Sequence, residues 1–579
     1  MSELGRKDFK NPVDRMAHVA ITRFTGGLSP VSLSLAWMDW AMHLAMAPGL
    51  QAGLLEKTSH KLAQLAVYVR QSIADPASEP AVEPLPGDNR FRAAEWNSPP
   101  FNVYAQSFLL AQQWWWWAIH GVRGPSQHHK DVVWFCARQL LDMLSPSNFL
   151  LTNPALLKST LEQGGTNLIR GWQNWLEDQE RQTAGKPPAG VENFRVGEQV
   201  AATPGQVIYR NRLIELIQYS PTTTDVLAEP VLFVPAWIMK YYILDLSPDN
   251  SMVRYLVERG HTVFMISWRN PDSEDHALGM EDYLRLGVLD ALEAVGKICP
   301  QHRVHLVGYC LGGTLATITA AQLGRDNDDR LASMTLFAAQ TDFTEAGELL
   351  LFIDDSQLTF LEDMMWDRGY LDASQMSGAF QMLRSNDLLW SRLVHEYMLG
   401  ERSPMFDLMA WNADSTRMPY KMHKEYLRKL FLNNELANGH YLVDGRPVAI
   451  SDIRAPVFIV GATKDHIAPW RSVYKFRLQA DVPVTFLLTA GGHNAGIVNP
   501  PGKPRASYQM ETHLEGTPYL DPDAWAERTP RQEGSWWPAW QQWLVQHSSA
   551  QAWSPPAMGN AAAGLVPLCA APGRYVLRL

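Results

Sequence analysis

The chain has little cysteine and no long apolar run. Four cysteines among 579 residues are too few and too scattered for a disulfide framework, and the first residues, MSELGRKDFK, lack the apolar stretch of a secretory signal. The most apolar early stretch, residues 31–50, is interrupted by Asp39, His43 and Pro48, so it falls short of the about 20 apolar residues that a membrane-spanning helix needs. We therefore expect a reduced, cytoplasmic protein with no transmembrane segment.

The sequence also has no excess of basic residues and no clear metal-ligand pattern. Lys and Arg number 50 against 60 Asp and Glu, so the net charge is −10, which argues against a nucleic-acid partner. No Gly-rich phosphate loop of nucleotide-binding form occurs. His128 and His129 have no acidic or cysteine partner at ligand spacing, so we expect no metal.

Apolar residues are plentiful, at 46%, and their spacing divides the chain. Up to about residue 181 they recur at helical spacing, as in Leu62, Leu65 and Val69, which predicts an all-helical N-terminal domain over residues 1–195. Four prolines within residues 74–88 predict an extended loop inside it. Most of the tryptophans, including Trp114–Trp117, are expected to form buried or interfacial aromatic surfaces. The stripe around Trp540 is expected to serve packing, with contact to a hydrophobic phase as the alternative.

From residue 196 short apolar runs alternate with helical stretches, which predicts a mainly parallel, doubly wound α/β sheet. The runs begin at Val231, Val263, Val304, Met334, Val457 and Val484. The predicted core therefore covers residues 196–340 and 452–547. Residues 341–451 are too long for a loop and are mostly of helical pattern, so they predict an inserted cap. Residues 548–579 form a Pro/Ala/Gly-rich tail that we expect to pack loosely.

The strongest chemical motif is Gly308-Tyr309-Cys310-Leu311-Gly312, between a predicted strand and a predicted helix. It has the form of a nucleophile elbow with Cys in place of Ser, which indicates an α/β-hydrolase fold. Glycines two positions before and after the central residue allow the sharp turn. A helix N-terminus also favours the thiolate form of Cys310. We therefore predict that Cys310 is a nucleophile.

A cysteine nucleophile on this fold needs an acid and a base that follow it along the chain. Asp465 and His493 each come just after a predicted strand, at the sheet edge where Cys310 emerges, and are predicted to be that acid and base. His466 is an alternative base, although it is better suited to face the pocket. Asp452 and Asp481 are alternative acids, although their positions suit a turn and a strand start.

Acyl transfer also needs donors for an oxyanion. The backbone N–H of Leu311, directly after the nucleophile, is predicted to be one. The second should come from the loop after the run at Val231, where Trp237 and Ile238 are equal candidates.

Several longer motifs make the chain closely resemble the polyhydroxyalkanoate synthases, which polymerise 3-hydroxyacyl-CoA into storage polyester. They are PSNFLLTNPALL at 146–157, KYYILDLSP at 240–248, SWRNP at 267–271, GYCLGGT at 308–314, FDLMAWNADST at 406–416, DHIAPW from Asp465, GGHNAGIVNPP at 491–501 and the closing PGRYVLRL. The match runs over most of the chain, and the combination is highly specific.

The resemblance implies a Cys310–His493–Asp465 triad that polymerises (R)-3-hydroxyacyl-CoA and releases coenzyme A, with no separate cofactor. It places His466 and Arg384 along the path of the CoA substrate. Tyr309 and Leu311 are similar to the class I pattern, which favours short monomers. It further implies a homodimer, and a growing polyester chain on whose granule surface the cytoplasmic enzyme sits. The alternatives are a Cys-dependent thioesterase or esterase and a non-enzymatic granule-coat protein.

Overall fold

The computed structural model describes residues 11–75, 78–373, 375, 378, 385–549 and 551–579. The chain divides into two compact units. The sheet unit comprises Met1–Ile21, Gly190–Met376 and Met405–Leu579, and the helical unit comprises Thr22–Ala189 and Ser377–Pro404. The domain boundaries expected from the sequence stay predictions. In this division residues 377–404, which lie within the predicted cap, group with the helical unit.

The helical unit has no strand among its described residues, as the helical spacing of its apolar residues predicts. Side chains of Ser29, Ser126 and Asn153 accept hydrogen bonds from backbone N–H groups and so cap three of its helices. Its elements are α2 (Pro30–Ala45), α3 (Pro48–Ala74), η1 (Ala94–Asn97), α4 (Phe101–His120), α5 (Gln127–Met143), η2 (Pro146–Asn148), α6 (Pro154–Glu162), α7 (Thr166–Thr183), η9 (Asn386–Trp390) and η10 (Leu393–Met398); α1 (Pro12–Thr25) is shared between the two units.

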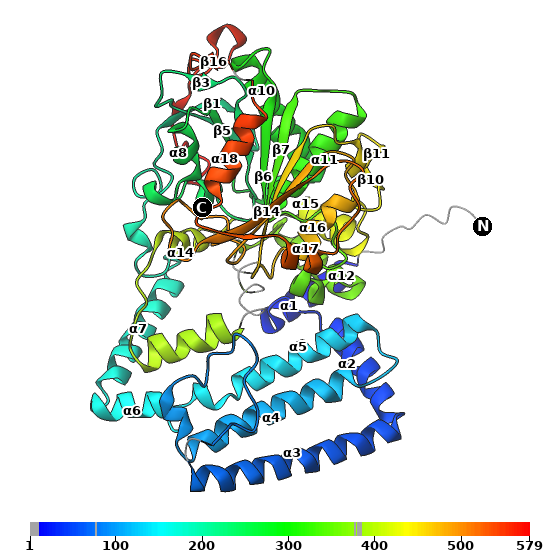
Figure 1. The fold of residues 1–579 in the computed structure, drawn as a ribbon, viewed down its shortest axis with the longest axis vertical. Coiled ribbons are helices and arrows are strands. Elements are labelled where there is room, and N and C mark those ends of the chain that lie inside the picture. The colour runs from blue at the N-terminus through cyan, green and yellow to red at the C-terminus, as the bar shows by residue number, and fades with distance from the viewer. Residues whose placement is uncertain (1–10, 76–77, 374, 376–377, 379–384, 550) are drawn as a thin grey trace, which may run out of the picture. The chain divides into compact units, whose positions relative to one another are not determined.

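In the described part of the sheet unit, strands form one eleven-stranded sheet in the order β15-β14-β13-β12-β7-β6-β4-β5-β2-β1-β17. Figure 1 labels β1, β5, β6, β7 and β14 of this sheet. The run from β13 to β5 is parallel, as predicted, and the flanking strands are antiparallel. The strands are β1 (Gly205–Arg210), β2 (Ile214–Tyr219), β4 (Val231–Val234), β5 (Val263–Trp268), β6 (Val304–Tyr309), β7 (Leu331–Phe337), β12 (Val457–Ala462), β13 (Val484–Thr489), β14 (Ser507–His513), β15 (Arg531–Glu533) and β17 (Cys569–Ala570).

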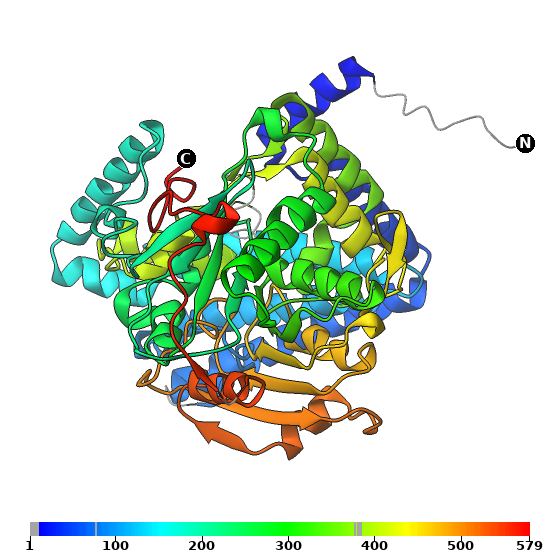
Figure 2. The same cartoon turned by 90° about the horizontal axis from the view of Figure 1, so that it is seen from above.

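Both faces of the parallel strands are covered, which explains why their sequences are almost continuously apolar. Leu306 and alternate neighbours pack with α10 (Asp290–Ile298) and α11 (Leu311–Arg325). Phe233 and the opposite set pack with α8 (Met252–Val257) and α18 (Trp537–Gln546). The ring of Trp540 lies 6.4 Å from that of Phe233 and 5.0 Å from that of Phe337, so the tryptophan stripe serves packing, as predicted. Figure 2 shows these layers from above.

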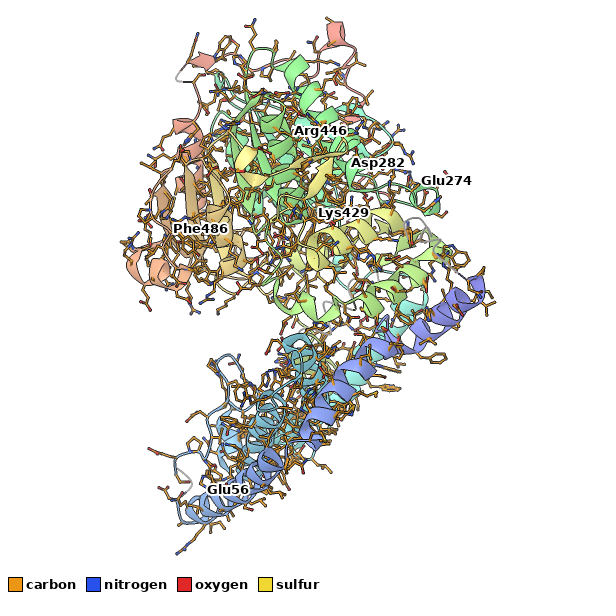
Figure 3. The ribbon with its side chains drawn as sticks, turned by 90° about the vertical axis from the view of Figure 1, so that its right-hand side faces the viewer. Glu56, Glu274, Asp282, Lys429, Arg446 and Phe486 are labelled. Carbon is orange, nitrogen blue, oxygen red and sulfur yellow. The ribbon has the colours of Figure 1, made fainter. Side chains whose placement is uncertain are left out.

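The remaining parts of the sheet unit are shorter elements that connect the strands or lie in the insertion after β7. Figure 3 marks two of them, with Lys429 on η11 and Arg446 on β11. The insertion contains η8 (Gly347–Phe352), α12 (Asp355–Arg368), β8 (Tyr370–Leu371), α14 (Asp407–Asn412), β9 (Met418–Pro419), α15 (Tyr420–Glu425), η11 (Tyr426–Leu432), β10 (Tyr441–Val443) and β11 (Arg446–Val448). The connections contain η3 (Val191–Asn193), β3 (Val226–Leu227), η4 (Tyr241–Leu244), η5 (Pro248–Asn250), η6 (Ser273–Asp275), α9 (Met280–Asp282), η7 (Tyr283–Leu289), η12 (Ile450–Asp452), α16 (Trp470–Tyr474), η13 (Lys475–Leu478), α17 (Pro522–Arg528), β16 (Ala552–Trp553) and η14 (Ala561–Ala563).

The expectation that the C-terminal tail packs loosely is wrong. The buried carboxylate of Glu215 on β2 accepts backbone hydrogen bonds from Arg574 and Tyr575, both 2.8 Å. β17 pairs with β1, and Val576 is buried. A charged group inside the sheet needs partners, and the tail supplies two of them beside the guanidinium of Arg210, whose Nε donates to Glu215 at 2.7 Å.

Candidate active site

Cys310 lies at the turn between β6 and α11, at the carboxyl end of a parallel strand. Its φ of 52° and ψ of −126° are strained for a non-glycine residue, and it caps the N-terminus of α11. Its backbone N–H donates to the carbonyl of Phe337 on β7 at 2.9 Å, and its own carbonyl accepts from Gly313 at 2.8 Å. The strand–turn–helix geometry of a nucleophile elbow is therefore present.

The two glycines of the motif are required by close backbone contacts. A Cβ on Gly308 would lie 2.3 Å from the Cα of Gly313, and a Cβ on Gly312 would lie 2.1 Å from the carbonyl oxygen of Val234. Any side chain at either position would push α11 away from β6 or β4. The same contact places the chain that leaves β4 directly beside the start of α11.

His493 and Asp465 lie together on loops after the neighbouring parallel strands β13 and β12. The His493 Nδ1 and Asp465 Oδ2 atoms are 2.7 Å apart, and both residues are buried. The other carboxylate oxygen of Asp465 accepts backbone hydrogen bonds from Ile467 at 2.9 Å and Ala468 at 2.8 Å. A hydrogen bond from the Lys464 N–H to the Gly491 carbonyl ties the two loops together. The carboxylate is thus held in one orientation toward the imidazole.

The electrostatic surroundings favour a charged His493. Burial alone would disfavour the imidazolium, but Asp465 and the nearby Cys310 raise the pKa of His493 well above its usual value. Because Cys310 acts on the imidazole in this way, its thiol lies near His493, and the structure brings all three predicted residues together. A thiol beside an imidazole that is oriented by a carboxylate can act as a nucleophile.

The predicted oxyanion donors lie on two segments that meet beside the elbow, the start of α11 and the loop after β4. Leu311 is the first residue of α11, so its N–H has no acceptor within the helix. Trp237 and Ile238 follow β4, and Ile238 and Cys310 pack against the same apolar cluster. Trp237 is buried, with its indole N–H donating to the Met422 sulfur at 3.2 Å.

The alternative acids lie elsewhere. Asp452 accepts the backbone N–H of Ala449 in a turn, and Asp481 is exposed before β13. His466 is half-buried next to Asp465, and its backbone carbonyl closely approaches Gly347 at the start of the inserted segment. Arg384 lies outside the described residues, so its predicted place along the substrate path has no structural counterpart here.

The structure adds two side chains that the sequence did not indicate, Tyr426 and Asn494, and gives Tyr309 a place beside them. Tyr426 of η11 is close enough to Cys310 that the cysteine charge adds to the effect of burial in raising the pKa of the phenol. The Tyr309 hydroxyl donates to Asn494 at 2.6 Å, and its ring lies 5.6 Å from that of His493. Its position next to His493 could have drawn attention to Asn494. Nothing in the local sequence pattern marks Tyr426.

The residues that the structure describes contain no group of three or more His, Cys, Asp or Glu side chains that could hold a metal ion. Within the same residues, no helix is long and apolar enough to cross a membrane.

The sheet order and the elbow define a protein of the α/β-hydrolase fold, and residues 229–500 match the family model described as alpha/beta hydrolase fold. Residues 87–256 match the model "Poly-beta-hydroxybutyrate polymerase (PhaC) N-terminus", and residues 8–49 match "Poly-beta-hydroxybutyrate polymerase N terminal". The chain is 41% identical over 509 residues to the poly(3-hydroxyalkanoate) polymerase of Methylorubrum extorquens, which covers 86% of this chain and 82% of that protein.

It is also 35% identical over 514 residues to the poly(3-hydroxyalkanoate) polymerase subunit PhaC of Cupriavidus necator, covering 87% of this chain and 85% of that one. The corresponding subunit of Rhizobium meliloti is 38% identical over 483 residues, with 82% and 77% covered. The chain therefore belongs to the poly(3-hydroxyalkanoate) polymerases, which are acyltransferases. The predictions of fold class and enzyme class are confirmed.

Proposed function

We propose that this polymerase uses Cys310 as the acylated nucleophile, His493 as the base and Asp465 as the residue that orients the base. The substrate is an (R)-3-hydroxyacyl-CoA, and coenzyme A is released. The short-monomer preference that accompanies Tyr309 and Leu311 belongs to the same proposal. The single observation that supports it best is the buried His493, whose Nδ1 lies 2.7 Å from Asp465 Oδ2 and whose pKa is raised in part by the nearby Cys310.

The first half of the reaction is a thioester exchange. The Cys310 sulfur attacks the acyl carbonyl carbon of the CoA thioester, and its proton goes to His493. When the tetrahedral intermediate collapses, the bond to the CoA sulfur breaks and the leaving thiolate takes the proton from His493. Because one thioester replaces another, the acyl group keeps its reactivity toward a hydroxyl.

The second half forms the ester. The hydroxyl of another 3-hydroxyacyl group attacks the acyl-Cys310 carbonyl, loses its proton to His493 and displaces the cysteine sulfur, which recovers the proton. The hydroxyl needs the base more than the thiol does, because an alcohol does not ionise near neutral pH. Water would compete with the hydroxyl, so the pocket must limit hydrolysis.

Replacement of the nucleophile tests this assignment. Cys310→Ala is expected to abolish coenzyme A release from (R)-3-hydroxybutyryl-CoA, while Cys136→Ala and Cys299→Ala keep most of the activity. Burial raises the pKa of Cys136, and raises that of Cys299 to about 12, so neither thiol ionises readily. Coenzyme A release and insoluble polyester are measured side by side.

Coenzyme A release by a folded Cys310→Ala variant would place the nucleophile elsewhere. Release of soluble hydroxyacid by the wild-type enzyme, in place of polyester, would favour the thioesterase alternative. Loss of activity in Cys136→Ala or Cys299→Ala would show that a second thiol takes part.

Attachment to the polyester granule and a homodimer are further parts of the proposal. Many large apolar side chains of the helical unit are exposed, which is unusual for a surface that meets only water. One set at helical spacing lies on α7, where Ile169 is 60%, Trp172 57% and Leu176 46% exposed. An aliphatic polyester is the apolar phase that the proposed reaction itself creates, so we assign this face to the polymer surface.

A further inference from the structure

The loop that follows β4 is held by a segment nearly 180 residues further along the chain. The Thr416 hydroxyl donates to the carbonyl of Trp237, and the Thr416 N–H donates to the carbonyl of Ile238 at 3.1 Å. The indole N–H of Trp411 donates to the carbonyl of Lys240 at 2.8 Å. All of these groups except Ile238 belong to residues that are at most 5% exposed.

These bonds also fix where the N–H groups of the loop point. In a trans peptide the carbonyl of one residue and the N–H of the next point in opposite directions. Because the Trp237 carbonyl faces the Thr416 hydroxyl, the N–H of Ile238 faces away from Thr416. The chain leaving β4 touches Gly312, two residues after Cys310, so this peptide lies on the chain that passes the elbow.

We propose that Thr416 is a positioning residue that holds the Trp237–Ile238 peptide so that the Ile238 N–H serves as the second oxyanion donor beside Leu311. The inference rests on the proposed Cys310 acylation. It favours the Ile238 N–H over the Trp237 N–H because the Ile238 N–H shares a peptide group with the Trp237 carbonyl, and the Thr416 hydroxyl holds that carbonyl. Preorganised donors stabilise a tetrahedral intermediate because they need no rearrangement during the reaction.

Other bonds hold the neighbouring groups, such as that from the Trp268 indole N–H to the Pro235 carbonyl at 2.8 Å, whereas the Thr416 hydroxyl holds the Trp237 carbonyl. The loop lacks the Gly-rich sequence of many oxyanion loops, and Trp237–Met239 lie outside any helix or longer strand, apart from a bridge between Met239 and Ser415. The bridge and both Thr416 bonds come from adjacent residues of the inserted segment, Ser415 and Thr416. Loss of one hydroxyl should therefore loosen the peptide without removing the donor.

The test is Thr416→Val, which removes the hydroxyl but keeps the shape and the backbone N–H. Two rates are measured in the full-length enzyme. One is single-turnover release of coenzyme A from a saturated acyl-CoA, which acylates Cys310 but has no 3-hydroxyl for elongation. The other is alkylation of Cys310 by iodoacetamide, which needs the thiolate but forms no oxyanion.

We expect Thr416→Val to slow acylation about 10-fold, which is less than the about 100- to 1,000-fold cost of deleting an oxyanion donor outright. The alkylation rate and its pH dependence should not change. Thr416→Ser should restore acylation. Thr319→Val is the matched control, because the buried Thr319 hydroxyl also donates to a backbone carbonyl, that of Leu315 at 2.8 Å, within α11.

Equal slowing of acylation and alkylation would overturn the inference, since Thr416 would then support the whole site. Unchanged acylation would overturn it as well. If Thr416→Val does not fold, Trp411→Phe removes the next bond to the same loop and should show the same selective loss. The proposed nucleophile is tested separately, because acylation that persists in Cys310→Ala would refute that assignment whatever Thr416 does.

Discussion

Cys310 is useful as a nucleophile because of where its backbone is held. Its positive φ costs a non-glycine residue about 1–3 kcal/mol, which the contacts of Gly308 and Gly312 with the adjoining chains must offset. That conformation lifts the thiol out of the strand toward the loop that carries His493. The strained backbone of Cys310 and the two glycines therefore act together to present the thiol.

His493→Gln tests the role of the base through the pH dependence of Cys310 alkylation. The raised pKa of His493 keeps an imidazolium available to stabilise the thiolate at and above pH 6.5. Without it, the thiolate loses its positively charged neighbour, so alkylation at pH 7 should fall at least about 10-fold and recover at higher pH. Polymerisation should fall about 1,000-fold or more, because the hydroxyl step also loses its base.

The matched variant is His466→Gln, which changes the neighbouring ring. It should leave the alkylation profile unchanged and act mainly on the apparent affinity for the CoA substrate. A variant series in which His466→Gln shifts the profile and His493→Gln does not would exchange the two roles.

At the scale of elements, the central strands could be predicted and the outer strands could not. β4 and β6 are apolar along their whole length because helices cover both faces. β2 contains Glu215 and Gln218, and both are buried: Arg210 on β1 pairs with Glu215, and distant parts of the chain supply the remaining partners, such as the Gly559 N–H at 2.8 Å from Gln218. No local pattern reveals a partner that arrives more than 300 residues later.

For the same reason only part of the candidate active site could be predicted. Cys310, Asp465 and His493 each follow a recognisable strand, and parallel strands bring their carboxyl ends to one edge. Thr416 and Tyr426 come from the inserted segment, whose path back over the sheet depends on tertiary packing. Sequence spacing therefore indicates the reacting groups but not the residues that position or flank them.

Helix α7 shows the reverse of the usual amphipathic arrangement. Its polar side chains face other parts of the helical unit: Asn167 donates to the Met398 carbonyl at 2.8 Å, and Asn174 donates to that of Glu396 at 2.9 Å. Gly171 allows the backbone of Tyr397 to approach closely. The apolar side chains point outward, so burying them adds stability only when another apolar surface is present.

We expect Ile169→Ser/Trp172→Ser to weaken binding of the enzyme to amorphous 3-hydroxybutyrate polyester granules, at least about 10-fold in a co-sedimentation assay. Burying two such side chains is worth several kcal/mol in total, since each contributes about 1.5–3 kcal/mol. Arg170→Ser/Gln173→Ser, two polar residues on the same helix, should bind normally. Equal binding by both double variants would remove the assignment of this face to the polymer.

The stability of the whole chain depends on histidines that the reaction does not use. Burial lowers the pKa of His261 and His423 to about 4 each, and lowers that of His305 to about 3. His305 lies inside the sheet, where its ring nitrogens are 2.7 Å from the Ser333 hydroxyl and 2.9 Å from the Ser548 hydroxyl. These rings stay neutral in the folded chain, whereas the unfolded chain protonates them near pH 6.5.

The sign of the pH effect follows from that difference. Above pH 6.5 neither state binds the protons, so these histidines leave stability unchanged. As the pH falls from 6.5 toward 4, the unfolded state binds protons that the folded state does not, and the free energy of unfolding declines. At pH 5 each ring contributes a loss of about 2 kcal/mol. His493 acts in the opposite direction, because its raised pKa favours proton binding by the folded state.

Unfolding by urea between pH 7.5 and pH 5 should therefore show the free energy of unfolding falling steeply below pH 6.5. His261→Gln is the informative variant, because glutamine does not titrate, and an amide still suits the contact with Gln541, which lies 3.3 Å from the His261 Nε2. Below pH 6.5 the free energy of unfolding of this variant should fall less steeply with pH than that of the wild type, by the equivalent of close to one bound proton. A wild-type curve that is flat from pH 6.5 to 5, or a variant slope equal to that of the wild type, would show that His261 becomes protonated without unfolding.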